Sequence, residues 1–339
     1  MQRKPIQIDL ALQGGGSHGA FTWGVLDRLL EEPWLHIAGI SGTSAGAMNA
    51  AVLACGWTAG GARGAQAALE RFWQCVSRAA SISPLQRSPV DRWLGRWSLD
   101  TSPTYVFMDL MSRLISPYAL NPFDFNPLRR ILRDCIDFDK LADSPIKLFI
   151  TATSVRTGRG RIFRNSEITA DILLASACLP TMFRAIEIDD ESYWDGGFTG
   201  NPTITPLVRE TDAHDSILVQ INPHERAETP RTAPEIINRL NEISFNSSLL
   251  KELRMIALLR QVADAGSGEG ARWAQMRTHR IMTDMLVKFG SSSKLNAEWD
   301  FVAMLRNEGR RAASEFLDAH GMDLGKRSTA DFDVLMTGY

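Results

Sequence analysis

The stretch that most restricts the fold of this 339-residue chain is an apolar run that leads into three glycines and then into an amphipathic segment. It reads IDLALQGGGSHGAFTWGVL, from Ile8 to Leu26. Ile6–Leu12 alternates and is rich in β-forming residues, whereas the apolar residues between Phe21 and Leu29 recur at helical spacing. A second apolar run follows at Ile37–Ser41. The order strand, helix, strand predicts an α/β fold built on a mostly parallel sheet.

Further segments extend this pattern. Strands are expected at Lys147–Ser154 and Ser216–Asn222, and helices at Ala45–Cys55, Ala62–Ala79 and Asn126–Ile136. After Asn222 the sequence becomes polar and carries three prolines in PHERAETPRTAPE, as a linker or long loop would. Beyond it the strand patterns stop, and amphipathic helices are expected at Ile236–Ala263, Trp273–Phe289 and Glu298–His320.

The glycine spacing has two nucleotide-binding interpretations. Gly14, Gly16 and Gly19 match the G-x-G-x-x-G of a dinucleotide fold, but that fold places an acidic residue at the end of the next strand, where this chain reads IAGISGTSAG. A phosphate-binding P-loop needs G-x-x-x-x-G-K-[ST], and no lysine stands in that place. A third interpretation is a tight turn that only lets a helix pack on a strand.

The second strand runs directly into Gly42-Thr43-Ser44-Ala45-Gly46, a G-x-S-x-G pattern. Small residues two before and two after a serine permit a sharp turn from strand to helix that exposes the hydroxyl. The Ala45 amide and the start of the following helix then lie beside that hydroxyl and favour negative charge. The pattern indicates a nucleophilic serine, and a serine N-cap with packing glycines is the alternative.

The glycine loop fits this chemistry. Adjacent parallel strands end at the same edge of a sheet, so Gly14 to Gly16 are expected beside Ser44. Glycines can turn their N–H groups toward a negatively charged oxygen, and each donor of such an oxyanion hole is typically worth about 3 kcal/mol in the transition state. We therefore expect the loop to hold a tetrahedral intermediate instead of a phosphate.

A serine hydroxyl needs a base that takes its proton. In the usual α/β-hydrolase order the histidine follows the acid, and none of the candidates lies in a glycine-flanked loop: His214, His224, His279 and His320. The segment SYWDGG offers a carboxylate instead, because a short β-type run delivers Asp195 into Gly196 and Gly197. Taken alone, a D-G pair usually marks a turn.

Composition excludes several classes. A net charge of −2 without a basic stripe argues against a nucleic-acid binder. The four cysteines lie far apart without a C-x-x-C pair, so neither a metal site nor a cofactor is expected. No stretch reaches the ~20 apolar residues of a membrane span. No secretion signal is visible after MQRKP, and a cytoplasmic location is expected.

In this order QGGGSHG, GTSAG, ASACLPTMF and WDGG resemble the motifs of the patatin-like phospholipases, over about Ile6–Arg209. The resemblance implies an α/β three-layer sandwich with a mostly parallel central sheet. It places a catalytic domain at residues 6–209 and an α-helical C-terminal region at residues 233–339, packed on or beside it. The implied activity is that of a lipid acyl hydrolase of the phospholipase A type, which requires no cofactor or metal.

Carried over residue by residue, the resemblance makes Ser44 the nucleophile and Asp195 the general base of a dyad without histidine. It assigns the oxyanion hole to Gly14, Gly15 and Gly16, with Gly14 shaping the loop. Supporting loop residues are Gly19, Gly42, Gly46, Gly196 and Gly197. One departure is His18, which stands where the family loop usually carries Arg or Lys. The implied partners are a lipid ester substrate and a membrane surface contacted peripherally, with no nucleic acid.

Two other functions stay open. A Ser-His-Asp carboxylesterase of the α/β-hydrolase type normally has its elbow after several strands, whereas Ser44 follows the second. A non-catalytic scaffold would use the glycine loop to bind a nucleotide or anion. Residues 93–125 are rich in aromatic and aliphatic side chains but broken by prolines. They form either a lid or acyl-chain pocket, or a surface that contacts a bilayer, or ordinary core under a long insertion.

Overall fold

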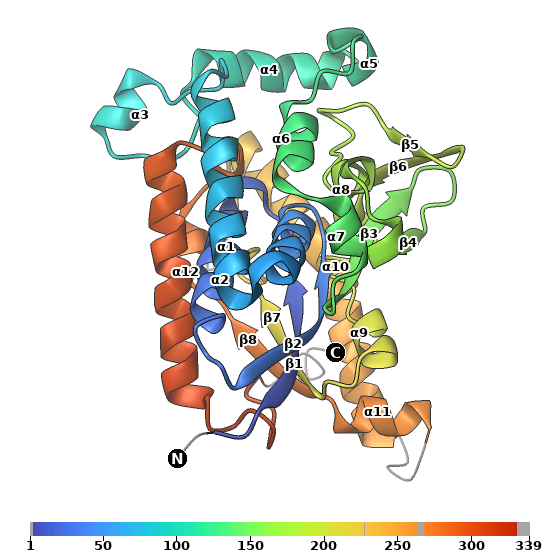
Figure 1. Ribbon diagram of the computed structural model, residues 1–339. Helices are drawn as coiled ribbons and strands as arrows, with labels where there is room; N and C mark the ends of the chain where they lie inside the picture. Colours follow the sequence, from blue (N-terminus) through green and yellow to red (C-terminus); the bar gives the residue numbers. More distant parts are fainter. Residues whose placement is uncertain (1–2, 227, 263–267, 331–339) are drawn as a thin grey trace.

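A computed structural model describes residues 3–226, 228–262 and 268–330 (Figure 1). Its centre is an eight-stranded sheet in the order β5-β6-β3-β2-β1-β7-β8, with β4 paired to β3. The parallel strands are β1 (Ile6–Leu12), β2 (Leu35–Gly42), β3 (Lys147–Ser154), β7 (Asp215–Val219) and β8 (Arg277–Ile281). The mostly parallel α/β fold that the sequence predicts is confirmed.

The remaining strands are antiparallel and lie at one side of the sheet: β4 (Gly160–Arg164), β5 (Ile186–Ile188) and β6 (Glu191–Asp195). The pairing of β6 with β3 sets Asp195 opposite Ala152, while Gly42 at the end of β2 lies opposite Ile150. Because β2 and β3 are parallel, the residue two positions beyond Gly42 comes level with Asp195. That residue is Ser44.

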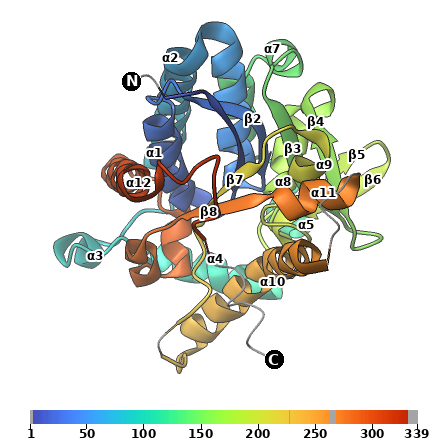
Figure 2. The same cartoon turned by 90° about the horizontal axis from the view of Figure 1, so that it is seen from below.

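Helices cover both faces of the sheet, as Figure 2 shows. One face carries α1 (Gly19–Leu29), α2 (Ala45–Ser81) and α12 (Trp299–His320), and the other α9 (Thr205–Glu210), α10 (Ala233–Val262) and α11 (Glu269–Gln275). Successive side chains of a strand point to opposite faces. Accordingly Leu10 and Leu12 belong to one buried core with Phe301, and Ala11 to a second core with Leu253. These are the layers of the expected sandwich.

Three short helices within residues 89–120 cross one end of the molecule, at the top of Figure 1. They are α3 (Pro89–Trp93), α4 (Pro103–Leu114) and α5 (Pro117–Leu120), each with proline in its first turn. Proline suits that position because a backbone N–H in the first turn has no intrahelical acceptor, so nothing is lost when proline lacks one. The connection back to β3 contains α6 (Pro127–Cys135) and α7 (Phe138–Ala142), and α8 (Ala170–Ser176) precedes β5.

The C-terminal segment corrects one expectation. The helix expected at Trp273–Phe289 is wrong: α11 ends at Gln275, strand β8 follows and joins the sheet beside β7, and a short 3-10 helix spans Asp284–Lys288. The apolar residues there do recur at helical spacing, but pairing with the free edge of β7 overrides this local pattern. The helices expected at Ile236–Ala263 and Glu298–His320 are present as α10 and α12. Ala263 and residues 331–339 lie outside the described residues.

The two helices expected at Ala45–Cys55 and Ala62–Ala79 are both present within α2, on either side of a break in the helix. Its backbone leaves helical geometry at Gly60 and Gly61, and Gly61 has a positive φ of 60°. Glycine adopts this conformation without steric cost, so the chain bends there and continues as helix.

Close packing of α12 on α1 ties the C-terminal segment to the sheet. Gly24 and Gly309 face each other at the crossing, and a Cβ on either would overlap backbone of the opposite helix. We expect Gly309→Ala to lower the free energy of unfolding by about 2 kcal/mol, because overpacking outweighs the better helix propensity of alanine. Urea denaturation measures this. Asn307→Ala, on the exposed side of α12, is the matched control and should leave stability unchanged; equal stability of the two variants would contradict the packing described.

Candidate active site

Ser44 occupies a sharp turn between β2 and α2. Its backbone has φ 54° and ψ −122°, a conformation that residues other than glycine rarely adopt. The turn closes because Gly42 and Gly46 lack side chains: a Cβ on Gly42 would lie 2.7 Å from the carbonyl carbon of Gly46. The amide of Ser44 donates a hydrogen bond to Oγ of the buried Ser176 (2.9 Å). The hydroxyl is thereby held at the end of the strand, at the start of a long helix.

Asp195 lies beside this hydroxyl. The Ser44 hydroxyl lies close enough to its carboxylate to lower the carboxyl pKa, and the Gly197 amide donates a hydrogen bond to Oδ1 (2.7 Å). The Asp195 backbone is fixed by its amide, which donates to the carbonyl oxygen of Cys178 (2.8 Å), and by its carbonyl oxygen, which accepts from Oγ1 of Thr153 (2.8 Å). The structure therefore brings Ser44 and Asp195 together, although they lie about 150 positions apart in the sequence.

The environment of Asp195 makes its carboxylate more basic. The residue is only 2% exposed, and this burial raises its pKa from 3.8 to about 7, against the lowering effect of the Gly197 amide and the Ser44 hydroxyl. A carboxylate with this pKa can accept a proton near neutral pH, and its conjugate acid can return it.

Gly196 and Gly197 permit the close approach that positions Asp195. A Cβ on Gly196 would overlap the carbonyl oxygen of Thr151, and one on Gly197 would overlap the ring of Phe245 in α10. The structure identifies the partners as β3 and the C-terminal helix α10.

The glycine loop lies directly against Ser44. A Cβ on Gly14 would be 2.8 Å from the Cβ of Ser44, and one on Gly19 would be 2.7 Å from the Cβ of Ala45. The Gly14 amide donates to Oδ1 of Asn201 (2.7 Å). It is therefore already engaged within the folded chain. The amides of Gly15 and Gly16 donate to no acceptor among the residues that the structure describes.

Buried amide side chains hold this loop, and sequence reasoning missed them. Oε1 of Gln13 accepts hydrogen bonds from the backbone amides of Ile221 and Asn222 (both 2.8 Å). Its Nε2 donates to the carbonyl oxygen of Asn201 (3.2 Å). Asn222 donates from Nδ2 to the carbonyl oxygen of Gly14 (2.8 Å). All these side chains are at most 3% exposed. An apolar run that ends in a glutamine could have suggested a buried polar partner, but nothing local indicates the residues it meets.

His18 is buried and faces the C-terminal segment. Oγ of Ser293 donates to the carbonyl oxygen of Gly290 (2.6 Å), so Nε2 of His18 is the donor in its 2.8 Å hydrogen bond to Ser293. Burial, with a contribution from the charge of Lys294, holds the pKa of His18 well below its usual range. The imidazole is consequently neutral at physiological pH.

The other histidines do not complete a triad with Ser44. His279 bonds through Nε2 to Asp215 (3.0 Å) and through Nδ1 to Thr329 (2.9 Å), at the opposite end of the sheet because Asp215 begins β7. His320 lies beside Asp323. Within the described residues no histidine hydrogen-bonds to Ser44, and no group of three or more His, Cys, Asp or Glu side chains is arranged to hold a metal ion.

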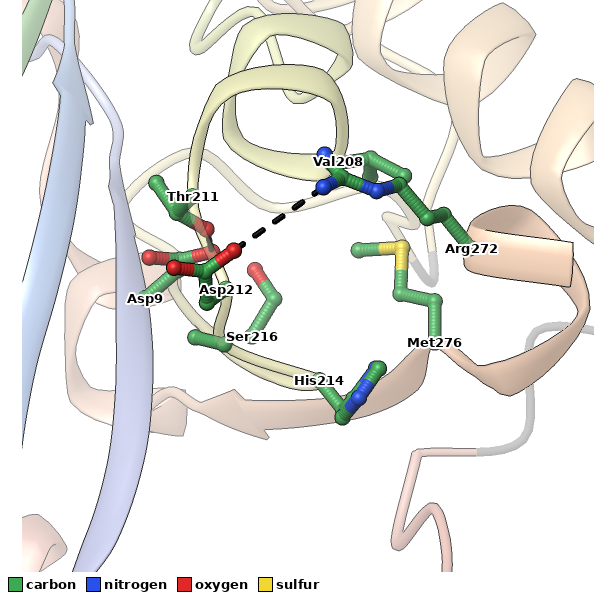
Figure 3. Close-up of a pocket in the computed structure, with 9 residues that line it drawn as sticks. Asp9, Val208, Thr211, Asp212, His214, Ser216, Arg272 and Met276 are labelled. Carbon is green, nitrogen blue, oxygen red and sulfur yellow. Dashed lines mark hydrogen bonds and ion pairs between the residues drawn. The ribbon is translucent and has the colours of Figure 1, made fainter. Parts of the chain in front are cut away.

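A separate cavity of about 230 Å³ lies between α9, the start of β7 and the end of α11 (Figure 3). Asp9 lines it with Thr211, and Arg272 forms an ion pair with Asp212 at 3.8 Å. Burial raises the pKa of Asp9 to about 8, so this carboxyl is largely protonated at neutral pH. None of its lining residues belongs to the glycine loop or to the serine turn, so this cavity is distinct from the site around Ser44.

Taken together, the parallel sheet, the strained serine turn and the adjacent glycine loop define an α/β protein whose serine turn has the backbone geometry of a nucleophile elbow. Residues 10–208, more than half of the chain, match the family model described as Patatin-like phospholipase. The chain therefore belongs to the patatin-like phospholipase family, as its motifs predicted.

Among solved structures, the chain resembles VipD from Legionella pneumophila, with 15% sequence identity and a TM-score of 0.41. The match covers 94% of this chain and 67% of VipD. A search of the curated proteins found no match. None of the described helices is both long enough and apolar enough to cross a bilayer.

Proposed function

We propose that this protein is a lipid acyl hydrolase of the phospholipase A type, in which Ser44 and Asp195 form a catalytic dyad. The observation that carries the proposal is the position of the Ser44 hydroxyl beside a buried carboxylate whose pKa is raised to about 7. Membership of the family supports the same assignment.

In the first half of the reaction the Ser44 hydroxyl attacks the ester carbonyl carbon while its proton passes to Asp195. The amides of Gly15 and Gly16 donate to the oxyanion of the tetrahedral intermediate. When the intermediate collapses, the ester C–O bond breaks and protonated Asp195 gives its proton to the departing alcohol oxygen. The product is an acyl-enzyme with the fatty acyl group on Ser44.

In the second half Asp195, again ionised, takes a proton from a water molecule that attacks the acyl carbon. The same amides hold the second oxyanion. Collapse releases the fatty acid, and the proton on Asp195 returns to Oγ of Ser44. Each proton taken is given back, so no metal or cofactor is needed to balance the cycle.

Exposed apolar side chains support a lipid substrate. We name as the apolar cap the residues of α4, α5 and the loop that follows which are at least 47% exposed: Val106, Phe107, Leu110, Leu114, Tyr118, Leu120, Phe123 and Phe125. Such a concentration is unusual on a protein surface that contacts only water. The cap is joined to the segment before Asp195, because Arg184 donates to the carbonyl oxygen of Pro122 (3.0 Å) and the Ala185 amide donates to Oη of Tyr118 (3.3 Å). In the proposed function the cap contacts the membrane surface peripherally.

Substitutions in the cap test the lipid assignment. We expect Leu110→Glu with Phe123→Ser to lower hydrolysis of phosphatidylcholine–phosphatidylglycerol vesicles at least about tenfold, because apolar area that enters the bilayer is lost. Hydrolysis of soluble p-nitrophenyl butyrate should change less than about twofold, since the dyad is untouched. Met322→Ser, an exposed apolar residue just after α12, is the matched control. Equal losses on vesicles and on the soluble ester would contradict a role of the cap at the membrane.

A further inference from the structure

Lys294 lies against the glycine loop although it comes from the C-terminal segment, beyond the residues that match the family model. It belongs to the short 3-10 helix Ser291–Leu295. A Cβ on Gly16 would overlap the carbonyl oxygen of Lys294, so the two backbones are in direct contact. The backbone of Lys294 therefore limits where the loop can lie.

The side chain of Lys294 reaches the same loop through one intermediary. Its Nζ donates to Oδ1 of Asn222 (2.7 Å), and Nδ2 of Asn222 donates to the carbonyl oxygen of Gly14 (2.8 Å). The Gly14 carbonyl and the Gly15 N–H belong to one peptide unit. A continuous chain thus runs from the ammonium, through a side-chain amide and a peptide bond, to the N–H that is free to meet an oxyanion.

We propose that Lys294 is a positioning residue that strengthens the Gly15 N–H as an oxyanion donor through this chain, which we name the Lys294 relay. The inference rests on the proposed acyl-transfer function of Ser44. A cation that polarises one end of an amide makes the N–H at its other end a stronger donor, and hydrogen bonds in series reinforce one another in a buried setting. The relay thereby aids the step in which negative charge develops on the substrate oxygen.

The charged groups around Lys294 determine the pH range in which its ammonium is protonated. Burial and the charge of Arg226 lower the pKa of its ammonium to about 8, and the carboxylate of Glu242 on α10 raises it. Glu242 itself is paired with Arg226 and Arg239. His18, on the glycine loop side, is neutral and adds no charge. Lys294 is thus protonated below about pH 8 and loses its charge above it.

The relay predicts a particular pH profile. Asp195 must be ionised to act as base, so kcat should rise with pH through about 7. Lys294 must be charged, so kcat should fall again as the pH passes about 8. Lys294→Arg keeps its charge at all accessible pH values and should remove the falling limb while leaving the rising limb in place.

The experiment measures kcat and KM for p-nitrophenyl butyrate between pH 5 and 10 with the full chain. We expect Lys294→Met to lower kcat roughly tenfold with KM nearly unchanged, because the relay acts in the transition state. Lys294→Arg should recover most of that loss at pH 7. Lys288→Met, which removes an exposed lysine from the preceding 3-10 helix, is the control and should behave as wild type.

Several results would overturn the relay. Arginine and methionine variants with equal losses would mean that Lys294 serves packing alone, and a wild-type profile without a falling limb would mean that its charge is not used. Even where Lys294→Met fails to fold, the wild-type and arginine profiles decide the question. Failure of the proposed function looks different: wild-type protein would then show no hydrolysis that depends on Ser44, which would remove the relay with it.

Discussion

Replacing Asp195 by asparagine should lower kcat for ester hydrolysis by roughly 10⁴-fold, the scale on which catalytic dyads and triads lose activity when one member is removed. The amide of asparagine has the shape of the carboxylate, and its oxygen can still accept the hydrogen bond from the Gly197 amide. It cannot take a proton from Ser44. The measurement is the rate of p-nitrophenyl butyrate hydrolysis at pH 7.5.

The stability of the Asp195→Asn variant shows whether a loss of activity comes from unfolding. Burial raises the pKa of Asp195 to about 7 in the folded chain, above its unfolded value of 3.8. Its contribution to stability is therefore fully present below pH 3.8 and is lost as the pH rises through about 7. Asparagine has no such loss, so at pH 8 Asp195→Asn should be more stable than wild type by an amount on the order of a few kcal/mol. A variant that is inactive because it is unfolded would contradict this account of the site.

Replacing Ser44 by alanine should abolish hydrolysis to a similar extent, because the acyl group then has no oxygen on the enzyme to which it can transfer. The loss should again be roughly 10⁴-fold, and the double variant with Asp195→Asn should lose little more than either single variant, because the two groups act as a unit. Activity of each variant on the same ester gives the comparison. Losses that simply multiply would show that the two residues act independently.

The parts of this protein that the sequence predicted are those that local pattern and motif chemistry determine. Ile6–Leu12 and Lys147–Ser154 alternate or run apolar between clear turns, and both are strands with those limits. The serine turn and the proximity of Gly14 to Ser44 followed from the rule that adjacent parallel strands end at one edge. These features need only neighbouring residues and the topology of a parallel sheet.

Long-range contacts could not be predicted in this way. Strand β8 exists because β7 offers a free edge, and its own residues repeat at helical spacing. The partner of the Gly14 amide is Asn201, 187 positions along the chain, and Lys294 reaches Asn222 across 72 positions. A single buried asparagine or lysine carries no local pattern that names its partner. The supports of the glycine loop therefore became visible only in the folded chain.

The most direct test of the dyad is the rate at which a fluorophosphonate reacts with the protein as a function of pH, with the modified residue located by peptide mass spectrometry. We predict a single adduct on Ser44, formed at a rate that rises through about pH 7 as Asp195 ionises. The Asp195→Asn variant should react at least about 100-fold more slowly. An adduct on another residue, or labelling of Asp195→Asn as fast as wild type, would contradict a serine–aspartate dyad.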